Sequence, residues 1–349
     1  MRVSVIMPCF NEERFIARSL KSILSNGYSH DRLEVIVVDG MSEDGTRDIL
    51  REYALHDQRL RIIDNAKRIT SCGLNRAIEA STGEALLWFS AHNEYDQGYI
   101  SKCVHYLMNN HVDVVGGTIR TVSRESGLIA RSISMVLSVP FGVGNSYFRT
   151  GVKRPMLVDA VFGACYRRTV FDRVGMFNEN LVRGQDLEFS MRMRASGLKV
   201  LLAPDLCSTY YARSRYGEFL KHNYVNGMWA VLPFHYAEVF PVSYRHLIPM
   251  FFVFGLVAAL LLAAVSSRYS SFIIVVMLVY AFFTAYFAFR EAVRVRDWRF
   301  TVILPLMFLS LHLSYGMGSV VGLVKLFFSM RFWRLQLSRL LRQCFRKSI

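Results

Sequence analysis

Cysteine is scarce in this chain, and the cysteines that it has are scattered. The 349 residues include six of them, at Cys9, Cys72, Cys103, Cys165, Cys207 and Cys344. None of them forms a close pair of the kind that binds metal, and this spacing argues against a zinc site or a disulfide framework. We therefore interpret them as small buried or incidental thiols of a protein in a reducing compartment.

The amino-terminal segment lacks the features of a secretory signal peptide. Residues 1–10 contain too short an apolar stretch, have no small-residue cleavage site and run directly into a strand pattern. We therefore expect the globular part of the chain to stay in the cytoplasm.

Charge is nearly absent from three long stretches, at residues 247–265, 272–289 and 302–328. Their lengths are near or above the ~20 residues that span a bilayer. Because 349 residues also exceed the usual size of a single domain, we expect one globular domain with a membrane appendage. The expected divisions are a globular domain at 1–210, interfacial aromatic and basic helices at 211–246, transmembrane or re-entrant segments at 247–328 and a basic tail at 329–349.

Acidic residues are too few to balance the basic ones, and the formal net charge is +15. The excess lies beside the apolar stretches, at Arg290, Arg294, Arg296, Arg299, Arg331, Arg334, Arg339, Arg342, Arg346 and Lys347. Anionic lipid headgroups explain that placement, and the globular part has no basic-aromatic nucleic-acid motif, so we expect a membrane partner and no nucleic acid. Residues 211–246 interleave aromatic and basic side chains, as interfacial helices do; a soluble connector is the alternative.

The route of the third apolar stretch follows from the position of the basic residues. If the first two stretches cross from a cytoplasmic domain, the Arg-rich loop at 290–299 returns to the cytoplasm. A full third crossing would then leave the basic tail outside. We therefore expect a broken or re-entrant segment through residues 312–318, which would keep the tail inside.

The first hundred residues alternate two kinds of pattern. Short β-branched runs at 3–7, 34–38, 60–63 and 85–89 are separated by amphipathic stretches at 12–25, 45–55 and 71–81. This alternation predicts βαβ units and an α/β domain with a mainly parallel sheet. Ligands of such sheets bind beyond the carboxyl ends of the strands, where Asn11, Glu12, Asp39 and Ser42 fall.

Asp39 is the strongest candidate for binding a nucleotide. It ends an apolar strand, where a carboxylate can accept hydrogen bonds from a nucleobase, and Asn11 and Glu12 lie on the adjacent loop. The alternative is a turn aspartate in an Asp-Gly pair. Ser42, Asp44 and Thr46 have the pattern of N-cap residues for the next helix, and shape the pocket in this interpretation.

The loop after residues 85–89 is where a metal site is expected, because Mg²⁺ and Mn²⁺ prefer oxygen ligands that they share with phosphates. The usual pair of carboxylates is absent, and the chain has Ser90 and His92 instead. His92 can bind Mn²⁺ as a neutral imidazole, with Glu94 or Asp96 assisting, whereas Ser90 is a poor ligand. The alternative is a His92 that is only hydrogen-bonded at a strand end.

Asp186 is the candidate general base. It follows Gln185 at the start of a predicted helix, and a carboxylate there can deprotonate an acceptor hydroxyl during a single in-line displacement, which inverts the reacting carbon. We interpret Gln185, Glu188 and Arg192 as acceptor-binding or supporting groups. The alternative is that Asp186 and Glu188 cap the helix and pair with Arg192 or Arg194.

With these residues, the chain resembles the family 2 inverting glycosyltransferases of GT-A fold over residues 3–210. It is most similar to the membrane-anchored enzymes of succinoglycan-type exopolysaccharide assembly, through the patterns at 142–145, 158–159, 183–188 and 314–319. The resemblance implies nucleotide binding by Pro8, Phe10, Glu12 and Asp39, a metal motif that ends at His92, and Asp186 as the base. Relatives carry Asp where this chain has Ser90, which puts the Mg²⁺ or Mn²⁺ cofactor in question.

The Gln-x-x-Arg-Trp signature of processive synthases is missing, since residues 223–229 read NYVNGMW. We therefore expect transfer of one sugar from a nucleotide-diphosphate sugar, in the first place a UDP-sugar, to a polyprenyl-diphosphate-linked saccharide. The setting would be exopolysaccharide or cell-surface glycan synthesis, at the cytoplasmic face of the inner (plasma) membrane. Two alternatives remain: a polyprenyl-phosphate sugar synthase, and a noncatalytic scaffold subunit of a polysaccharide assembly complex.

Overall fold

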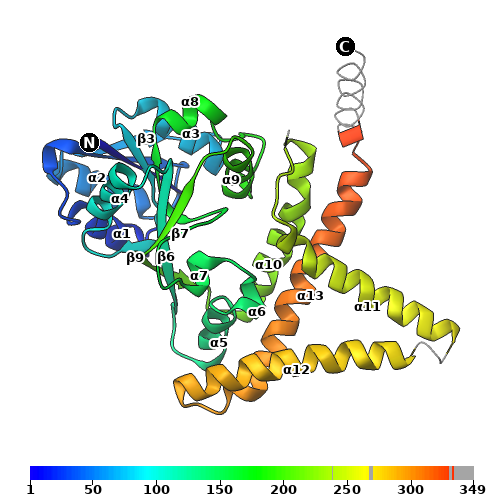
Figure 1. Ribbon diagram of the computed structural model, residues 1–349. Helices are drawn as coiled ribbons and strands as arrows, with labels where there is room; N and C mark the ends of the chain where they lie inside the picture. The colour runs from blue at the N-terminus through cyan, green and yellow to red at the C-terminus, as the bar shows by residue number, and fades with distance from the viewer. Residues whose placement is uncertain (238, 267–269, 330–331, 334–349) are drawn as a thin grey trace. The chain divides into compact units, whose positions relative to one another are not determined.

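The computed structural model describes residues 1–237, 239–266, 270–329 and 332–333 (Figure 1). They form two compact units. The sheet domain contains Met1–Arg124 and Asn145–Ala212, and the helical unit contains Glu125–Gly144 with the described residues from Arg213 onward. A single division at residue 210 did not anticipate that residues 125–144 join the helical unit. The expected basic tail lies almost entirely outside the described residues.

The sheet domain is built on a nine-stranded sheet with the order β3-β2-β1-β4-β8-β6-β9-β5, and with β7 paired to β9. The strands are β1 (Val3–Cys9), β2 (Leu33–Asp39), β3 (Leu60–Asp64), β4 (Ala85–Trp88), β5 (Asn93–Tyr95), β6 (Val114–Ser123), β7 (Met156–Leu157), β8 (Phe162–Arg167) and β9 (Val200–Ala212). Strands β1, β2, β3, β4, β6 and β9 run in one direction, and β5, β7 and β8 run opposite to them. The prediction of an α/β domain with a mainly parallel sheet is confirmed.

Helices cover both faces of this sheet. They are α1 (Ile16–Leu24), α2 (Thr46–His56), α3 (Thr70–Ala80), α4 (Tyr99–Asn109), α7 (Tyr147–Thr150), α8 (Thr169–Val174) and α9 (Gln185–Ala195), with a 3-10 turn η1 (His30–Arg32). Side chains of α1, α2 and α4 share one core cluster with Val5 of β1, whereas those of α3, α8 and α9 share the other with Ile6. Successive strand residues point to opposite faces, so the apolar run of β1 supplies both layers.

The helical unit contains the apolar stretches. Its elements are α5 (Leu128–Val136), α6 (Pro140–Val143), α10 (Tyr216–Val231), η2 (Leu232–His235), η3 (Tyr244–Leu247), α11 (Ile248–Val265), α12 (Ser270–Val295) and α13 (Phe300–Phe327). Three helical stretches of the described chain, Tyr244–Val265, Ile273–Val295 and Phe300–Phe327, are long and apolar enough to cross a membrane, with mean hydropathies of 2.7, 2.0 and 1.6. This agrees with the predicted membrane anchoring.

Residues 125–144 are tied into the helical unit by specific contacts. The guanidinium of Arg131 in α5 lies 4.8 Å from the ring centroid of Phe300, and its Nη1 lies 3.4 Å from Asp297. In α6, the ring of Phe141 lies edge-on to Phe308, with centroids 5.1 Å apart. These contacts explain why a segment from the middle of the sequence groups with the carboxyl-terminal helices.

The break expected at residues 312–318 is wrong, because α13 is one continuous helix from Phe300 to Phe327. Its glycines allow close helix packing instead. A Cβ at Gly318 would overlap the carbonyl oxygen of Tyr224, and a Cβ at Gly227 of α10 would overlap that of Tyr315. Ser319 donates a hydrogen bond of 3.0 Å to the carbonyl of Gly227. Small residues are the usual means by which apolar helices approach each other this closely.

Candidate active site

Strands β1, β2 and β3 end together at one edge of the sheet, and their last residues are in register. Cys9 is opposite Asp39, and Asp39 is opposite Asp64. Asp39 is fully buried, with 0% of its surface exposed. The loops that follow β1 and β2 therefore start from a rigid base, as expected for the ligand-binding edge of a parallel sheet.

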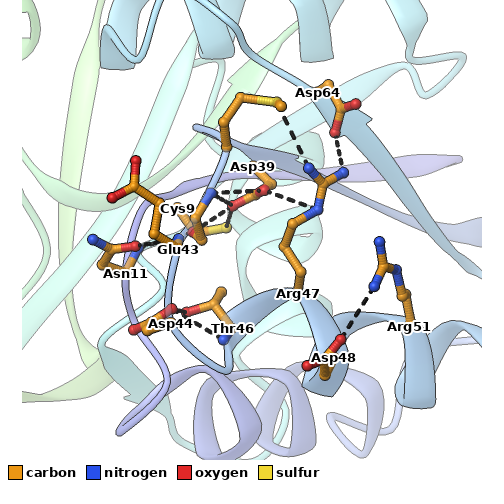
Figure 2. A network of polar contacts seen from close by, with 12 residues as sticks. Cys9, Asn11, Asp39, Glu43, Asp44, Thr46, Arg47, Asp48, Arg51 and Asp64 are labelled. Carbon is orange, nitrogen blue, oxygen red and sulfur yellow. Dashed lines mark hydrogen bonds and ion pairs between the residues drawn. The ribbon is translucent and has the colours of Figure 1, made fainter.

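The carboxylate of Asp39 organises the loop after β2 (Figure 2). Its Oδ1 accepts a hydrogen bond of 2.5 Å from the hydroxyl of Ser42, and both oxygens lie 3.1–3.2 Å from the Ser42 amide. Arg47 places its Nε 3.4 Å from Asp39 Oδ2 and its Nη2 2.5 Å from Asp64. Asp39 is thus a turn aspartate in this structure, and its direct contact with a nucleobase stays a prediction.

Ser42 also connects the loops after β1 and β2. Its hydroxyl accepts a hydrogen bond of 2.9 Å from the amide of Asn11, and Asn11 Oδ1 accepts one of 2.9 Å from the amide of Glu43. Asn11 adopts the left-handed conformation with φ 53°, which asparagine tolerates better than most residues. The side chains of Ser42 and Asn11 and the amides of Asn11 and Glu43 thus connect the two loops.

The expected N-cap roles are not observed as predicted. The N-cap position of α2 is Gly45, and no side chain caps it, so the prediction for Ser42, Asp44 and Thr46 is wrong in that form. Asp44 instead accepts a 3.0 Å hydrogen bond from the amide of Thr46, the first helical residue. The Thr46 hydroxyl accepts a 2.8 Å hydrogen bond from the amide of Glu12, so these residues again tie the two loops together.

Pro8 and Phe10 lie at the end of β1 and just beyond it. Pro8 is half-buried and pairs in register with Val38. Phe10 is 41% exposed, and the guanidinium of Arg68 lies 5.3 Å from its ring centroid. An exposed aromatic ring next to a cation is a surface on which a planar base can stack. The nucleotide-binding role of both residues stays a prediction.

His92 follows β4 and is paired with Glu12. Its Nδ1 lies 2.9 Å from Glu12 Oε1, and its ring lies edge-on to Tyr210 of β9, with centroids 5.9 Å apart. The two acids that were expected to assist His92 are engaged elsewhere: Glu94 accepts a 2.7 Å hydrogen bond from Tyr211, and Asp96 lies 3.7 Å from Arg120.

These side chains do not fit a Mg²⁺ or Mn²⁺ site that the protein alone provides. Within the described ranges, no three His, Cys, Asp or Glu side chains are grouped as metal ligands would be. Glu12 and His92 form only a pair, and Ser90 provides neither charge nor a strong ligand. A divalent cation at this position would take most of its ligands from a substrate and from water.

Asp186 is the second residue of α9, which begins after Gly184 in the left-handed conformation at φ 74°. The helix is held on the sheet by aromatic packing, since the ring of Phe189 lies 4.3 Å from that of Phe177 and 5.8 Å from that of Tyr166. A carboxylate on such a helix has a well-defined position, which general-base catalysis needs.

The surroundings of Asp186 change the pKa of its carboxyl group. Its residue surface is exposed, yet the surrounding protein removes enough water to raise the pKa of its carboxyl above the ordinary value. The backbone amides of Leu187 and Asp186 and the charge of Arg149 lower the pKa in opposition.

Glu188 and Arg192 have a structural role. Glu188 is 2% exposed, and its two oxygens lie 2.7 and 3.0 Å from Nε and Nη2 of Arg192. Arg192 also donates hydrogen bonds to the carbonyls of Val174 and Met176, which ties α9 to the end of α8. Arg194 pairs with Asp159 at 3.1 Å. Of the alternative pairings, the one between Glu188 and Arg192 is therefore present, whereas among the described residues no ion pair joins Asp186 to either arginine.

Sequence reasoning missed Arg149 of α7. Its guanidinium lies 5.4 Å from the ring centroid of Tyr210 and 5.5 Å from that of Phe148. Its Nη1 is buried and has no hydrogen-bond partner in the described part of the chain, and the same is true of Gln185 Oε1. Burial lowers the pKa of Arg149, whereas the charges of Tyr210 and Asp186 raise it. Only the Gly-rich pattern just before it, at 142–145, marked this region in the sequence.

The sheet domain also has known relatives. Residues 4–175 match the family described as Glycosyl transferase family 2. The chain contains a glycosyltransferase family 2 domain. It is 26% identical over 227 residues, 63% of this chain and 70% of the relative, to the dolichyl N-acetyl-alpha-D-glucosaminyl phosphate 3-beta-D-2,3-diacetamido-2,3-dideoxy-beta-D-glucuronosyltransferase of Methanococcus voltae. It is 27% identical over 252 residues, 67% of this chain and 75% of the relative, to the succinoglycan biosynthesis protein ExoA of Rhizobium meliloti (strain 1021).

Among solved structures, the fold resembles the mannosyltransferase PcManGT of Pyrobaculum calidifontis, determined in complex with GDP-Man and Mn²⁺. The TM-score is 0.59 with 19% sequence identity, and the match covers 92% of this chain and 87% of that one. This likeness supports the GT-A fold. The family domain and the named glycosyltransferase relative together make the chain a glycosyltransferase, and inversion of the anomeric centre is consistent with that domain.

Proposed function

We propose that this glycosyltransferase moves one sugar from a nucleotide-diphosphate sugar to a lipid-linked saccharide, with inversion, in the assembly of a surface glycan. The single observation that carries the proposal is Asp186: an exposed residue whose carboxyl has a raised pKa, at the start of a helix that aromatic side chains hold on the sheet. The names of the relatives support the acceptor class, since one acts on a dolichyl-linked sugar phosphate and another serves succinoglycan biosynthesis.

The proposed reaction uses Asp186 as the base. The oxygen of an acceptor hydroxyl bonds to the anomeric carbon while the bond from that carbon to the diphosphate oxygen breaks. The nucleoside diphosphate leaves with the electron pair, and Asp186 takes the hydroxyl proton. A raised pKa makes the carboxylate a better proton acceptor than an ordinary aspartate, and attack from the face opposite the leaving group inverts the centre.

The nucleotide would bind at the loops after β1 and β2. Phe10 offers a ring for the base, and Asp39, Asn11 and Ser42 hold the two loops in place for it. The donor is in the first place a UDP-sugar; a GDP-sugar belongs in the same test, because the structural relative binds GDP-Man. We assign no step to Mg²⁺ or Mn²⁺, since the donor set around Ser90 does not fit one, and a metal requirement stays a prediction.

Membrane anchoring suits a lipid-linked acceptor. The three apolar stretches would hold the protein at the bilayer, with the sheet domain on the cytoplasmic face of the inner (plasma) membrane. A polyprenyl carrier would then be found by a search confined to the membrane surface. Residues 211–246 would lie in the interface, although α10 buries Phe219, Asn223 and Gly227 within the helical unit.

The test is sugar transfer by the purified, detergent-solubilised protein. Radiolabelled UDP-, GDP- and dTDP-sugars are offered with a membrane lipid extract, with Mn²⁺ or with EDTA, to the wild type, to Asp186→Asn and to Asp172→Asn. Asp172 is an exposed acid on α8 and serves as the matched control. Transfer into the lipid fraction that only Asp186→Asn abolishes supports the proposal.

Two other outcomes contradict it. Transfer to bare polyprenyl phosphate, but not to a lipid-linked saccharide, would identify a polyprenyl-phosphate sugar synthase. No transfer from any donor, by a folded protein that also binds no nucleotide, would favour the noncatalytic scaffold.

A further inference from the structure

The leaving group of the proposed reaction needs a positive charge that the loop after β4 does not provide. As the bond to the anomeric carbon breaks, negative charge develops on the diphosphate, and a preorganised cation is the usual means of stabilising it. Ser90 stands where an acid would help hold a divalent cation, and the acids that follow it, Glu94 and Asp96, are bonded to other residues. This inference rests on the proposed function.

Arg149 has the properties of that cation. Its guanidinium lies against the ring of Tyr210, which in turn lies edge-on to His92. Arg149 and Asp186 also interact electrostatically, since the charge of each affects the pKa of the other. Arg149 therefore belongs to both halves of the site: the loop after β4, where a metal is expected, and the start of α9, where the base lies.

Arg149 also differs from the other arginines around the site. Four of them form ion pairs with carboxylates: Arg47 with Asp39, Arg68 with Glu43, Arg120 with Asp96 and Arg192 with Glu188. The Nη1 of Arg149 is buried, and no hydrogen-bond partner for it lies in the described ranges of the chain. A buried donor without a partner costs free energy, so such a group in a folded protein calls for an explanation.

We propose that Arg149 binds the diphosphate of the donor and neutralises the charge that develops on it as the glycosidic bond breaks. The guanidinium presents several N–H donors in a plane, and this geometry matches phosphate oxygens. It stays protonated throughout, so it donates hydrogen bonds and transfers no proton; the acceptor's proton still goes to Asp186. Arg149 is thus a catalytic residue, because it contacts the leaving group. It supplies the positive charge that Ser90 cannot help to supply by holding a metal ion.

The inference is tested with Arg149→Met, which removes the charge at similar size, and Arg149→Lys, which keeps the charge but loses the planar group. Arg173→Met is the matched control, because Arg173 of α8 lies 3.8 Å from Asp113, at the amino end of β6 and away from the carboxyl ends of the strands. Each protein is titrated calorimetrically with UDP, GDP and dTDP and with the matching nucleosides, with and without EDTA, and its kcat is measured. Thermal unfolding confirms that each variant is folded.

For the nucleotide that the wild type binds, we expect Arg149→Met to weaken the diphosphate at least 10-fold and the nucleoside less than 2-fold, and to lower kcat on the order of 100-fold. Arg149→Lys should lie between Arg149→Met and the wild type, Arg173→Met should match the wild type, and EDTA should leave diphosphate binding in place. Equal losses for diphosphate and nucleoside, an unchanged Arg149→Met, or diphosphate binding abolished by EDTA would each overturn the inference. A wild type without transfer from any donor would instead contradict the proposed function.

Discussion

The Nδ1 atom of His92 lies 2.9 Å from Oε1 of Glu12, which joins the loop after β4 to the loop after β1. Both side chains are partly buried, with 33% and 22% of their surfaces exposed. The pair thus lies next to the locked nucleotide loops on one side and next to Tyr210 on the other. It connects the proposed site of the nucleobase, at Phe10, to the proposed site of the diphosphate, at Arg149.

This pairing predicts that Glu12 and His92 act together. We expect Glu12→Gln and His92→Ala each to raise the KM for the donor on the order of 10-fold. Either change breaks the contact that joins the loop after β1 to the loop after β4. The double variant should be little worse than either single variant, with a coupling of about 1 kcal/mol. Steady-state kinetics of the four proteins measure this coupling, and strictly additive effects would contradict it.

The raised pKa of Asp186 predicts a pH dependence of transfer. Only the ionised carboxylate accepts a proton, so kcat/KM should fall as the pH is lowered through a value above the ordinary pKa of an aspartate. Asp186→Asn should lower kcat by about 10²- to 10⁴-fold and abolish this acid limb. A pH–rate profile with lipid-linked acceptor measures both. An acid limb at the same position in the residual activity of Asp186→Asn would assign it to another group.

The same carboxyl group predicts an effect on stability. Because its pKa is raised in the folded state, the folded protein binds more protons than the unfolded one between the ordinary and the raised value. The free energy of unfolding therefore falls as the pH rises through that window, and the loss persists at neutral pH. Asp186→Asn should unfold at a higher temperature than the wild type at pH 7, and the difference should shrink in acid. A lower unfolding temperature at pH 7 would contradict this prediction.

The buried pair of Glu188 and Arg192 should matter for stability. Removing one partner leaves a charge without compensation, and we expect Glu188→Gln to lower the free energy of unfolding by about 3–5 kcal/mol. Replacing both residues with Met should cost less than either single change, because no unpaired charge remains. Chemical unfolding followed by tryptophan fluorescence compares Glu188→Gln, Arg192→Met and the double Met variant. If the double variant is the least stable, the pair is not the cause.

Glycine packing in the helical unit gives a prediction with an internal control. Gly227→Ala and Gly318→Ala place a Cβ where it would overlap a backbone carbonyl oxygen. We expect each to lower the free energy of unfolding by about 1–3 kcal/mol. Gly255→Ala in α11 is the control, because nothing lies within 4 Å of its Cβ position. Thermal unfolding in detergent measures the three variants. Similar losses for Gly255→Ala would indicate a general effect of alanine in these helices.

Much of the sheet domain could be predicted because its signals are local. The apolar runs of β1 and β2 and the helical periods between them depend on neighbours in sequence, and all of these elements were found within a few residues of their observed bounds. Asp39 was located at its strand end for the same reason. Its partners Ser42 and Arg47 lie within eight residues of it, and a turn role could therefore be considered from the sequence alone.

Arg149 could not be found in this way, because its proposed role depends on residues that are distant from it in the sequence. Tyr210 and Asp186 reach it only through the pairing of β9 with β6 and the docking of α9 on the sheet. The glycines of α13 led to the wrong prediction of a break for a related reason. In a soluble helix they would suggest a break, and only the presence of α10 shows that they allow contact.

Residues 125–144 interrupt the sheet domain in sequence while they pack with the carboxyl-terminal helices. A protein shortened after residue 212 would keep α5 and α6, with the buried Ile133 and Val136 and with Phe141, but would lose α10, α12 and α13, against which these two helices pack. Their apolar side chains would then face water and promote aggregation. A soluble form of the enzyme would need a second excision, in which a short polar connection replaces residues 125–144.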